Sequence, residues 1–430
     1  MENQPDVNSL PPSLQGKKVV LVNHCDTLGE ASIATFRLMQ ALRREGVDAR
    51  MVVFTRISNE ENISMVGSRI SRGVRYALER LQLFIHSGFS DKNIFSISTG
   101  RFAHNVHNHP WIKEADIVCI NWVSQGLMNL KGIKTLHKMG KHIVWTMFDM
   151  WAFTGICHNS FECDYYKDQC GNCMYLKGGG HPDDLSHRVW EKKMKLYPEI
   201  PITFVAQTKW LELKARSSSL LRNKPVMTIN SAIPVDWYYS SSEQYISTLI
   251  TDLKPNRILI GATLLDGQGR GLEYTIDALN YVFDNYPEIA NETAAYFFGD
   301  LNNPTVLDSL RMSHRWFGRI NDQKILRYLF GTSKVIMSTS VNDDMPVTMV
   351  EGMAGGAIPV FFGGEGREHL VTHLENGYAA RPRDIVDLAK GLIWAFQSDI
   401  SRDALHDYAE SRFSPKAVAR KYIDLFAQII

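Results

Sequence analysis

Short apolar segments alternate with amphipathic helical segments along most of this chain. The apolar segments have the length of buried β-strands, and the helical segments carry apolar residues at intervals of three or four positions. We expect strands at 17–23, 49–54, 116–121, 142–147, 201–206, 226–229, 257–262, 294–298, 334–338 and 358–362, and helices at 31–45, 66–85, 272–283, 323–330 and 415–429. Continuous apolar strands that alternate with helices are typical of parallel sheets covered on both faces. The pattern therefore predicts an α/β protein.

The strand–helix series occurs twice, with a pause between Tyr238 and Lys254. A chain of 430 residues is long enough for two domains that each have a core. We predict one Rossmann-like domain at 17–238 and a second at 239–411. A polar, proline-rich stretch at 1–16 is expected to be a disordered lead, and 412–430 contains a last amphipathic helix.

The stretch from Ser338 to Gly364 carries the strongest chemical signal. It is expected to be a strand, a loop containing Asp343, a short helix that begins near Val347 and Thr348 and contains Glu351, and a second strand. Backbone N–H groups at the start of such a helix can face a phosphate, while a carboxylate can accept ribose hydroxyls. The structural alternative is an N-capping aspartate and a solvated glutamate.

The composition of the chain limits which binding partners and which cellular location we expect. The formal net charge is +1 with 22% charged residues, so no overall field indicates nucleic acid. No apolar run reaches the roughly 18–20 residues that a membrane-spanning helix needs. The first fifteen residues lack the apolar region of a secretory signal, so we expect a cytoplasmic protein.

The segment 66–85 combines an apolar stripe with several arginines. Val66, Ile70, Val74, Leu78 and Leu81 belong to the stripe, and arginines stand at 69, 72, 75 and 80. A basic amphipathic helix can dock on anionic lipid. The alternative is a core helix whose arginines form its solvated face.

Four of the six cysteines cluster at Cys157, Cys163, Cys170 and Cys173, and the last two form a CxxC pair. In a reducing compartment this set favours a structural, tetrahedral zinc site, although the spacing is not that of a standard zinc ribbon. Free thiols or a conditional disulfide are the alternatives. Cys25 and Cys119 lie in apolar strands and are expected to be buried hydrophobes.

The donor-site stretch resembles family 4 of the retaining glycosyltransferases. The shared features are an acid at Asp343, then Glu351, then a small-Gly-Gly-x-Ile-Pro-Val run, with 363–365 and 373–377 similar to the sequel in that family. The usual first acid is Glu, so Asp343 is shorter by one methylene. The resemblance implies two Rossmann-like domains facing across a cleft, the GT-B architecture, with the nucleotide held by the second domain and the last helix returning to the first.

The resemblance also implies roles for individual residues. Glu351 would bind the ribose of a UDP- or GDP-sugar, and Asp343 would approach the transferred sugar. Arg270 stands where the family carries a diphosphate-binding Lys, and Arg319 could supply the second cation of that clamp because the usual Arg position is Gly269. Gly29, in the first loop, would let the backbone approach the donor phosphates, although an ordinary turn glycine explains it as well.

A second motif narrows the resemblance to a bacterial capsule and exopolysaccharide subgroup. The chain reads WTMFDMWAFTG at 145–155 and continues into the Cys-rich insert at 155–180. In the subgroup a His precedes the shared Asp, but here that position is Phe148, which cannot hydrogen-bond. Asp149 would then contact the sugar or acceptor side, and His158 could compensate for the missing His.

These features together predict a cytoplasmic retaining hexosyltransferase that needs no cofactor for catalysis. Its acceptor would be a glycan, in the form of a lipid-linked intermediate of surface polysaccharide synthesis. The enzyme would reach this acceptor by contact with the inner face of the membrane. Two alternatives stay open. Phe148 favours an inactive nucleotide- or glycan-binding subunit, and the two-domain architecture is shared with sugar-nucleotide epimerases.

Overall fold

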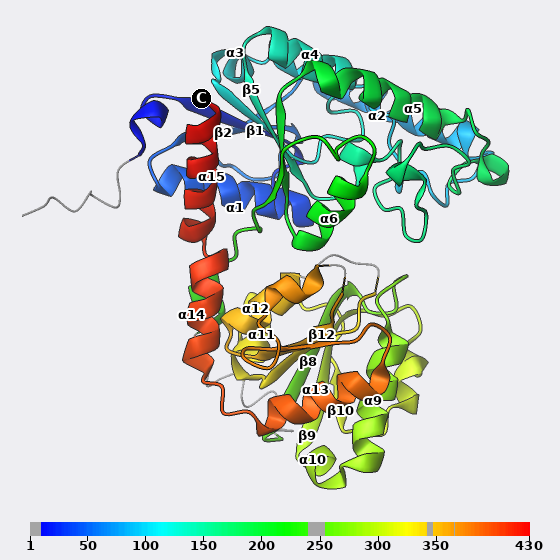
Figure 1. Cartoon of the computed structure of the whole chain (residues 1–430), viewed down its shortest axis with the longest axis vertical. Coiled ribbons are helices and arrows are strands. Elements are labelled where there is room, and N and C mark those ends of the chain that lie inside the picture. The colour runs from blue at the N-terminus through cyan, green and yellow to red at the C-terminus, as the bar shows by residue number, and fades with distance from the viewer. Residues whose placement is uncertain (1–9, 240–253, 342–346, 365) are drawn as a thin grey trace, which may run out of the picture. The chain divides into compact units, whose positions relative to one another are not determined.

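The computed structural model describes residues 10–239, 254–341, 347–364 and 366–430, and the chain divides into two compact units (Figure 1). The N-terminal unit contains the described residues up to Ala232 together with Val418–Ile430, and the C-terminal unit is Ile233–Ala417. The division therefore lies before the expected boundary after Tyr238. Val235 and Tyr238 are buried in the core of the C-terminal unit, which assigns this segment to it.

Within the described residues, the N-terminal unit has a seven-stranded sheet in the order β3-β2-β1-β4-β5-β6-β7, and every pairing is parallel. The strands are β1 (Lys18–Cys25), β2 (Asp48–Thr55), β3 (Ile63–Met65), β4 (Ile117–Ile120), β5 (His142–Met147), β6 (Ile202–Ala206) and β7 (Val226–Thr228). The helices are α1 (Glu30–Arg44), α2 (Arg69–His86), α3 (Pro110–Glu114), α4 (Leu130–Lys138), α5 (Leu185–Leu196), α6 (Lys209–Ser217) and most of α15 (Pro415–Ile429).

Alternate residues of these strands face two separate cores, as the period of a β-strand requires. Val19 and Leu21 pack in one core with apolar residues of α1 and α15. Val20 and Val22 pack in the other with residues of α4 and α6. Helices on both faces explain why the strands read as continuous apolar runs.

The expected disordered lead is wrong for its described part. Residues 12–14 form a short 3-10 helix, and Leu14 is buried against the core that contains Val19 and Leu42. The burial of one leucine anchors this segment, because removing its side chain from water favours the packed state. Residues 1–9 lie outside the described residues.

Within the described residues, the C-terminal unit has a six-stranded parallel sheet in the order β10-β9-β8-β11-β12-β13. Its strands are β8 (Asn256–Leu264), β9 (Thr293–Asp300), β10 (His314–Trp316), β11 (Val335–Ser338), β12 (Ile358–Phe362) and β13 (Tyr378–Ala380). Its helices are α7 (Val235–Tyr239), α9 (Leu272–Asn285), α10 (Pro287–Asn291), α11 (Gln323–Thr332), α12 (Val347–Ala354), α13 (Ile385–Gln397) and α14 (Arg402–Phe413). Helices α9 and α13 pack on each other, and α12 packs on α7 and α14.

The predicted α/β fold with two parallel sheets is thus confirmed. Short strands and helices that carry little periodic signal, such as β3, β10 and β13, were not expected from the sequence. In the part of the chain that the structure describes, no helix is both long and apolar enough to cross a membrane.

Candidate functional site

Each sheet has a point where the strand order reverses direction. In the C-terminal unit, β8 lies between β9 and β11, and in the N-terminal unit β1 lies between β2 and β4. Ligands of open α/β sheets bind outside the carboxyl ends of the strands at such a switch point. We therefore ask whether the candidate site residues of each unit lie at its switch point.

In the C-terminal unit, the loop after β8 is tied closely to the end of β11. Gly271, which precedes α9, has φ +69°, and a Cβ at this position would lie 2.3 Å from the Thr339 carbonyl oxygen. The Thr339 hydroxyl donates to the Gly271 carbonyl at 2.7 Å, and the Val341 N–H donates to the Gly269 carbonyl at 2.9 Å. Only glycine fits this positive φ and close approach without strain. The loop containing Arg270 is therefore fixed at the switch point.

Two helices begin beside this loop. Arg270 stands two residues before α9, which starts at Leu272, and α12 starts at Val347 and Thr348 after β11. The first N–H groups of a helix lack intrahelical partners and carry the positive end of its dipole. Arg270 and the starts of α9 and α12 thus provide positive potential at one edge of the sheet, as an anionic diphosphate requires.

Glu351 lies one turn into α12, and its carboxylate has a partner that the sequence did not indicate. The Tyr238 hydroxyl, on α7, donates a hydrogen bond to Glu351 Oε1. Tyr238 is buried, and its ring packs edge-on against Phe330 of α11. The rigid tyrosine fixes the direction of the Glu351 carboxylate.

Arg319 and Asp343 are also predicted to belong to the donor site. The Arg319 guanidinium forms an ion pair with Asp300 at the end of β9, and both side chains are about half exposed. Its partner in the structure is thus a carboxylate of its own sheet edge. Asp343 lies outside the described residues, as do its neighbours 342–346.

In the N-terminal unit, polar side chains lie at the carboxyl ends of β1 and β4, at the switch point. The Asn23 amide nitrogen donates to the Cys25 carbonyl at 2.7 Å, and its oxygen accepts the Trp122 N–H at 2.9 Å. Asn23 thus ties the two strand ends together. Gly29 begins α1 with φ +89°, and a Cβ there would meet nothing within 4 Å, so this glycine serves the backbone conformation while leaving open space beside it.

Two buried polar atoms at this edge have no hydrogen-bond partner among the described residues. They are His24 Nδ1, near the end of β1, and Asn121 Oδ1, directly after β4. The His24 ring stacks on Phe54 at 4.7 Å and meets Trp122 edge-on at 5.4 Å. Burial lowers the pKa of His24 to about 4, so the imidazole is neutral at pH 7. A buried unpaired acceptor is costly in a folded protein unless a ligand or water completes it.

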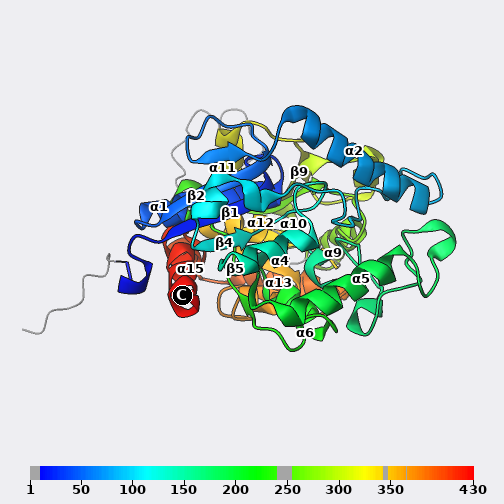
Figure 2. The same ribbon diagram turned by 90° about the horizontal axis from the view of Figure 1, so that it is seen from above.

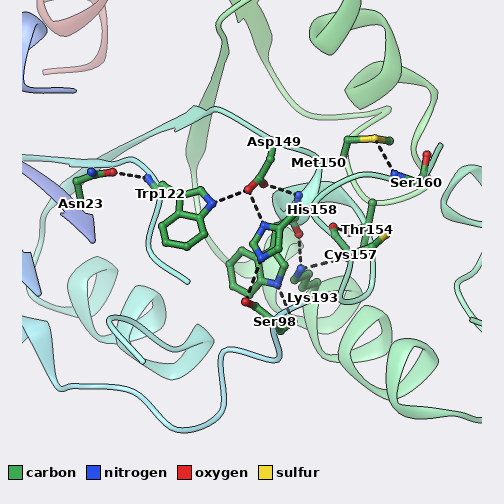
Figure 3. Close-up of polar contacts among 11 residues, drawn as sticks. Asn23, Ser98, Trp122, Asp149, Met150, Thr154, Cys157, His158, Ser160 and Lys193 are labelled. Atoms are coloured by element: carbon green, nitrogen blue, oxygen red, sulfur yellow. Dashed lines mark hydrogen bonds and ion pairs between the residues drawn. The ribbon is translucent and has the colours of Figure 1, made fainter. Parts of the chain in front are cut away.

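Asp149 forms the centre of a polar network next to this edge (Figure 3). Its carboxylate accepts hydrogen bonds from Trp122 Nε1 at 2.6 Å and from the Trp151 N–H at 2.8 Å, and its Oδ2 lies 2.6 Å from His158 Nδ1. His158 Nε2 lies 3.0 Å from the Ser98 hydroxyl. The network therefore links the ends of β4 and β5 to the segment that contains Ser98.

The network determines the charge of Asp149. Burial alone would raise the pKa of this carboxyl, but the neighbouring His158 and the hydrogen bonds from His158, Trp151 and Trp122 lower it overall. Asp149 is thus ionised at neutral pH and holds the Trp122 indole in place. Phe148, where the related motif has His, is half-buried. The imidazole that binds Asp149 comes from His158 instead.

Lys193 of α5 binds the segment that directly follows Asp149. Its buried ammonium donates to the carbonyls of Trp151, Thr154 and Gly155. Burial lowers the pKa of Lys193 to about 7. This contact was not expected from the sequence, because a lysine on a helix reads as solvated.

The four clustered cysteines are free thiols that influence one another electrostatically, so the fold does bring them together. The Gly155 N–H donates to Cys170 Sγ at 3.1 Å. Burial raises the pKa of Cys170 to about 12 and that of Cys173 to about 11. Among the described residues, however, no three His, Cys, Asp or Glu side chains are arranged so that they could hold a metal ion. Structural zinc at these four cysteines stays a prediction of the sequence.

Tyr238, His24 and Lys193 are the residues that sequence reasoning missed. A signal existed for His24, because Asn23 and His24 end one strand as Asn121 and Trp122 end another. Nothing local marks Tyr238, which is separated from Glu351 by 113 positions.

One protein family matches part of the C-terminal unit. Residues 308–412 match the model of the family described as "Glycosyl transferases group 1". This segment includes α12 and Glu351 and covers less than half of the chain. No curated protein matches the chain.

Solved structures with a similar fold include two that are described as glycosyltransferases. HepE of Anabaena, in a complex with UDP and glucose, has a TM-score of 0.59 and 11% identity, and the match covers 96% of this chain and 100% of HepE. A glycosyltransferase of Rickettsia africae has a TM-score of 0.61 at 12% identity, covering 96% and 99% of the two chains. WaaG, involved in lipopolysaccharide biosynthesis, has a TM-score of 0.58 at 12% identity, covering 95% and 99%. At this identity the likeness establishes the fold.

Proposed function

We propose that the protein is a glycosyltransferase that moves a sugar from a nucleotide-diphosphate sugar to a glycan acceptor. The observation that carries this proposal is the family match over 308–412, which contains α12 and Glu351 beside the β8–β11 switch point. The solved structure of HepE with UDP and glucose supports a donor of the same chemical class, a UDP- or GDP-sugar.

The donor would bind at the C-terminal unit. Arg270 and the N-termini of α9 and α12, with Val347 and Thr348, would neutralise the diphosphate, and Glu351 would accept the ribose hydroxyls. Asp343 would approach the transferred sugar. The departing diphosphate gains negative charge in the transition state, so preorganised positive groups stabilise that state more than the bound donor.

The acceptor side would lie at the N-terminal unit. His24 Nδ1 and Asn121 Oδ1 can accept hydrogen bonds from hydroxyl groups, and Trp122, fixed by Asp149, offers an aromatic surface against which an apolar sugar face can pack. Asp149 would act through Trp122 and His158 as a positioning residue. Gly29 would leave room for backbone approach.

The resemblance to family 4 supports a retaining reaction. The bond between the anomeric carbon and the phosphate oxygen breaks, a bond to the acceptor oxygen forms on the same face, and the acceptor proton passes to the departing diphosphate. This route needs no cofactor and makes a small demand on a protein base, which is compatible with Phe148.

We further propose that the acceptor is a lipid-linked intermediate of surface polysaccharide synthesis and that the enzyme works at the cytoplasmic face of the membrane. The subgroup motif at 145–173 and the amphipathic helix α2 support this setting.

One observation favours a second candidate function. Phe148 removes the imidazole that the related motif places beside the sugar, and His158 is engaged by Asp149 and Ser98. A protein of this kind could bind a nucleotide sugar or glycan without turnover and act as the subunit of a partner transferase.

A thermal-shift and hydrolysis screen against UDP- and GDP-sugars tests the proposal. Stabilisation by one nucleotide sugar, with slow release of free nucleotide, is the expected result and names the donor. Stabilisation without release, even with lipid-linked acceptors present, would favour the binding subunit. No response to any nucleotide sugar would overturn the assignment of the donor site.

A further inference from the structure

Helix α2 carries an apolar stripe that faces solvent. The stripe consists of five residues at helical spacing, with exposed fractions of 80% for Ile70, 52% for Val74, 41% for Leu78, 54% for Leu81 and 48% for Ile85. Figure 2 shows α2 as a long helix at the margin of its unit. The stripe therefore extends along one side of a helix of 18 residues, about 27 Å in length.

The opposite side of α2 packs against the rest of the N-terminal unit, and this side is partly polar. Glu79 is fully buried, and its Oε1 accepts the N–H groups of Thr99 at 3.0 Å and Gly100 at 3.2 Å. Arg80 pairs with Glu79 and donates to the Ile94 carbonyl. The helix thus buries an ion pair and exposes its aliphatic residues. The alternative interpretation of the sequence, a core helix with its apolar stripe buried and its arginines solvated, is therefore wrong. Burial in the core of this unit does not explain the apolar stripe.

The segment after α2 continues the exposed apolar surface. Phe89 is 68% exposed and adopts a φ of +64°, a conformation that costs a non-glycine residue roughly 1 kcal/mol or more. Its ring contacts Phe84 edge-on at 5.6 Å, and Phe95 is exposed nearby in the chain. Aromatic residues at the end of an aliphatic stripe are favoured where an apolar phase meets water.

Charge decides between the surfaces that could cover the stripe. Between residues 69 and 86 there are four arginines and one acid, Glu79, and this acid is buried in an ion pair with Arg80, so the excess positive charge belongs to Arg69, Arg72 and Arg75. Arg69 is exposed at the start of the stripe, while Arg72 and Arg75 are half-buried beside it. A second copy of the helix would bring like charges together, whereas lipid phosphates complement them.

We propose that the α2 surface, defined as Ile70, Val74, Leu78, Leu81, Ile85 and Phe89 with Arg69, binds the headgroup region of an anionic lipid bilayer. The helix would lie in the plane of the interface, with its aliphatic side chains inserted and Arg69 among the phosphates. This deepens the proposed function, because it names the surface that would bring the enzyme to a lipid-linked acceptor. The binding itself requires no turnover.

Co-sedimentation with vesicles tests the proposal on the full chain. We expect binding to phosphatidylcholine vesicles that contain phosphatidylglycerol, weaker binding to phosphatidylcholine alone, and a decrease with added salt. The double variant Leu78→Gln/Leu81→Gln should lower the partition coefficient by about tenfold for each leucine. Arg69→Ala should lower it by about fivefold on the anionic vesicles. The matched control is Leu213→Gln, an exposed leucine on α6 that should bind as the parent does.

The outcomes separate this inference from its alternatives. All of the substituted side chains are exposed, so circular dichroism and the melting temperature should stay unchanged and exclude misfolding. No vesicle binding, or equal losses in the Leu213→Gln control, would overturn the proposal. A dimer in solution that the double variant dissociates would assign the surface to a second copy instead. Nucleotide-sugar hydrolysis without vesicles reports on the donor site separately, so either proposal can fail alone.

Discussion

The Tyr238 hydroxyl donates a hydrogen bond to the Glu351 carboxylate, and so connects the first helix of the C-terminal unit to the helix expected to hold the ribose. A carboxylate held by a buried tyrosine keeps one direction without a ligand. This preorganisation lowers the entropy cost of binding.

We expect Glu351→Ala to weaken UDP or GDP binding by roughly tenfold to a hundredfold, because a charged acceptor for two hydroxyls contributes about 1.5–3 kcal/mol. Isothermal titration calorimetry measures this. Tyr238→Phe is the matched control: it should change nucleotide affinity less and lower stability by about 1 kcal/mol. Unchanged affinity in Glu351→Ala would exclude the ribose assignment.

Arg270→Ala should weaken UDP or GDP binding by about tenfold or more and leave the nucleoside alone unaffected, since the guanidinium would contact the diphosphate. Competition binding with nucleoside and with nucleotide separates the contribution of the diphosphate to affinity from that of the nucleoside. Arg319→Ala should have the smaller effect, because Arg319 is paired with Asp300 in an exposed position. Equal losses for nucleoside and nucleotide would show that Arg270 acts on the fold of its loop.

His24→Phe retains the stacking on Phe54 but removes the unpaired Nδ1. If this atom accepts an acceptor hydroxyl, the KM for the acceptor should rise about tenfold while nucleotide affinity stays constant. His107 also has a buried, unpaired Nδ1 but lies before α3, so His107→Phe is the control. A similar change in both variants would speak against an acceptor contact at His24.

The pH dependence of stability should reflect Asp149 and His24. The folded-state pKa of Asp149 is lowered, so its contribution is present above the ordinary value of 3.8 and is lost as the pH falls through the folded value. The pKa of His24 falls from 6.5 to about 4, so the unfolded chain takes up this proton first and stability decreases as the pH falls from 6.5 to 4.

Urea unfolding between pH 3 and pH 7 measures both effects. Asp149→Asn should cost about 1–3 kcal/mol at pH 7, because it removes the charged partner of Trp122 and His158. Asp164→Asn, which breaks an exposed ion pair with Lys167, should cost less than about 1 kcal/mol. Equal stability of the Asp149→Asn protein at pH 7 would contradict the network as a stabilising element.

The cysteine cluster can be tested without an activity assay. From the structure we expect Cys170 and Cys173 to react slowly with a thiol reagent at pH 7 and quickly after unfolding, because burial keeps both thiols protonated. Metal analysis of the purified protein belongs to the same experiment. One zinc per chain, released together with the thiols, would support the zinc site that the sequence predicts and contradict free thiols.

The sequence by itself determined the two α/β series, the strands of both sheets that are long enough to show periodicity, and the helix that contains Glu351. These features depend on local patterns, in which the spacing of apolar residues follows the period of the element. The same local pattern could not say which side of α2 is buried, and only the tertiary structure places Glu79 inside and Leu81 outside.

Tertiary structure alone also decided the partners of the candidate site residues. Tyr238 and Glu351 are 113 positions apart, and Ser98 and His158 are 60 apart, so no local pattern connects them. Polar side chains at strand ends acquire partners only when the sheet order brings those ends together. Apolar periodicity specifies elements because burial of a face is a property of one segment, whereas a hydrogen bond needs two segments to be placed within 3 Å of each other.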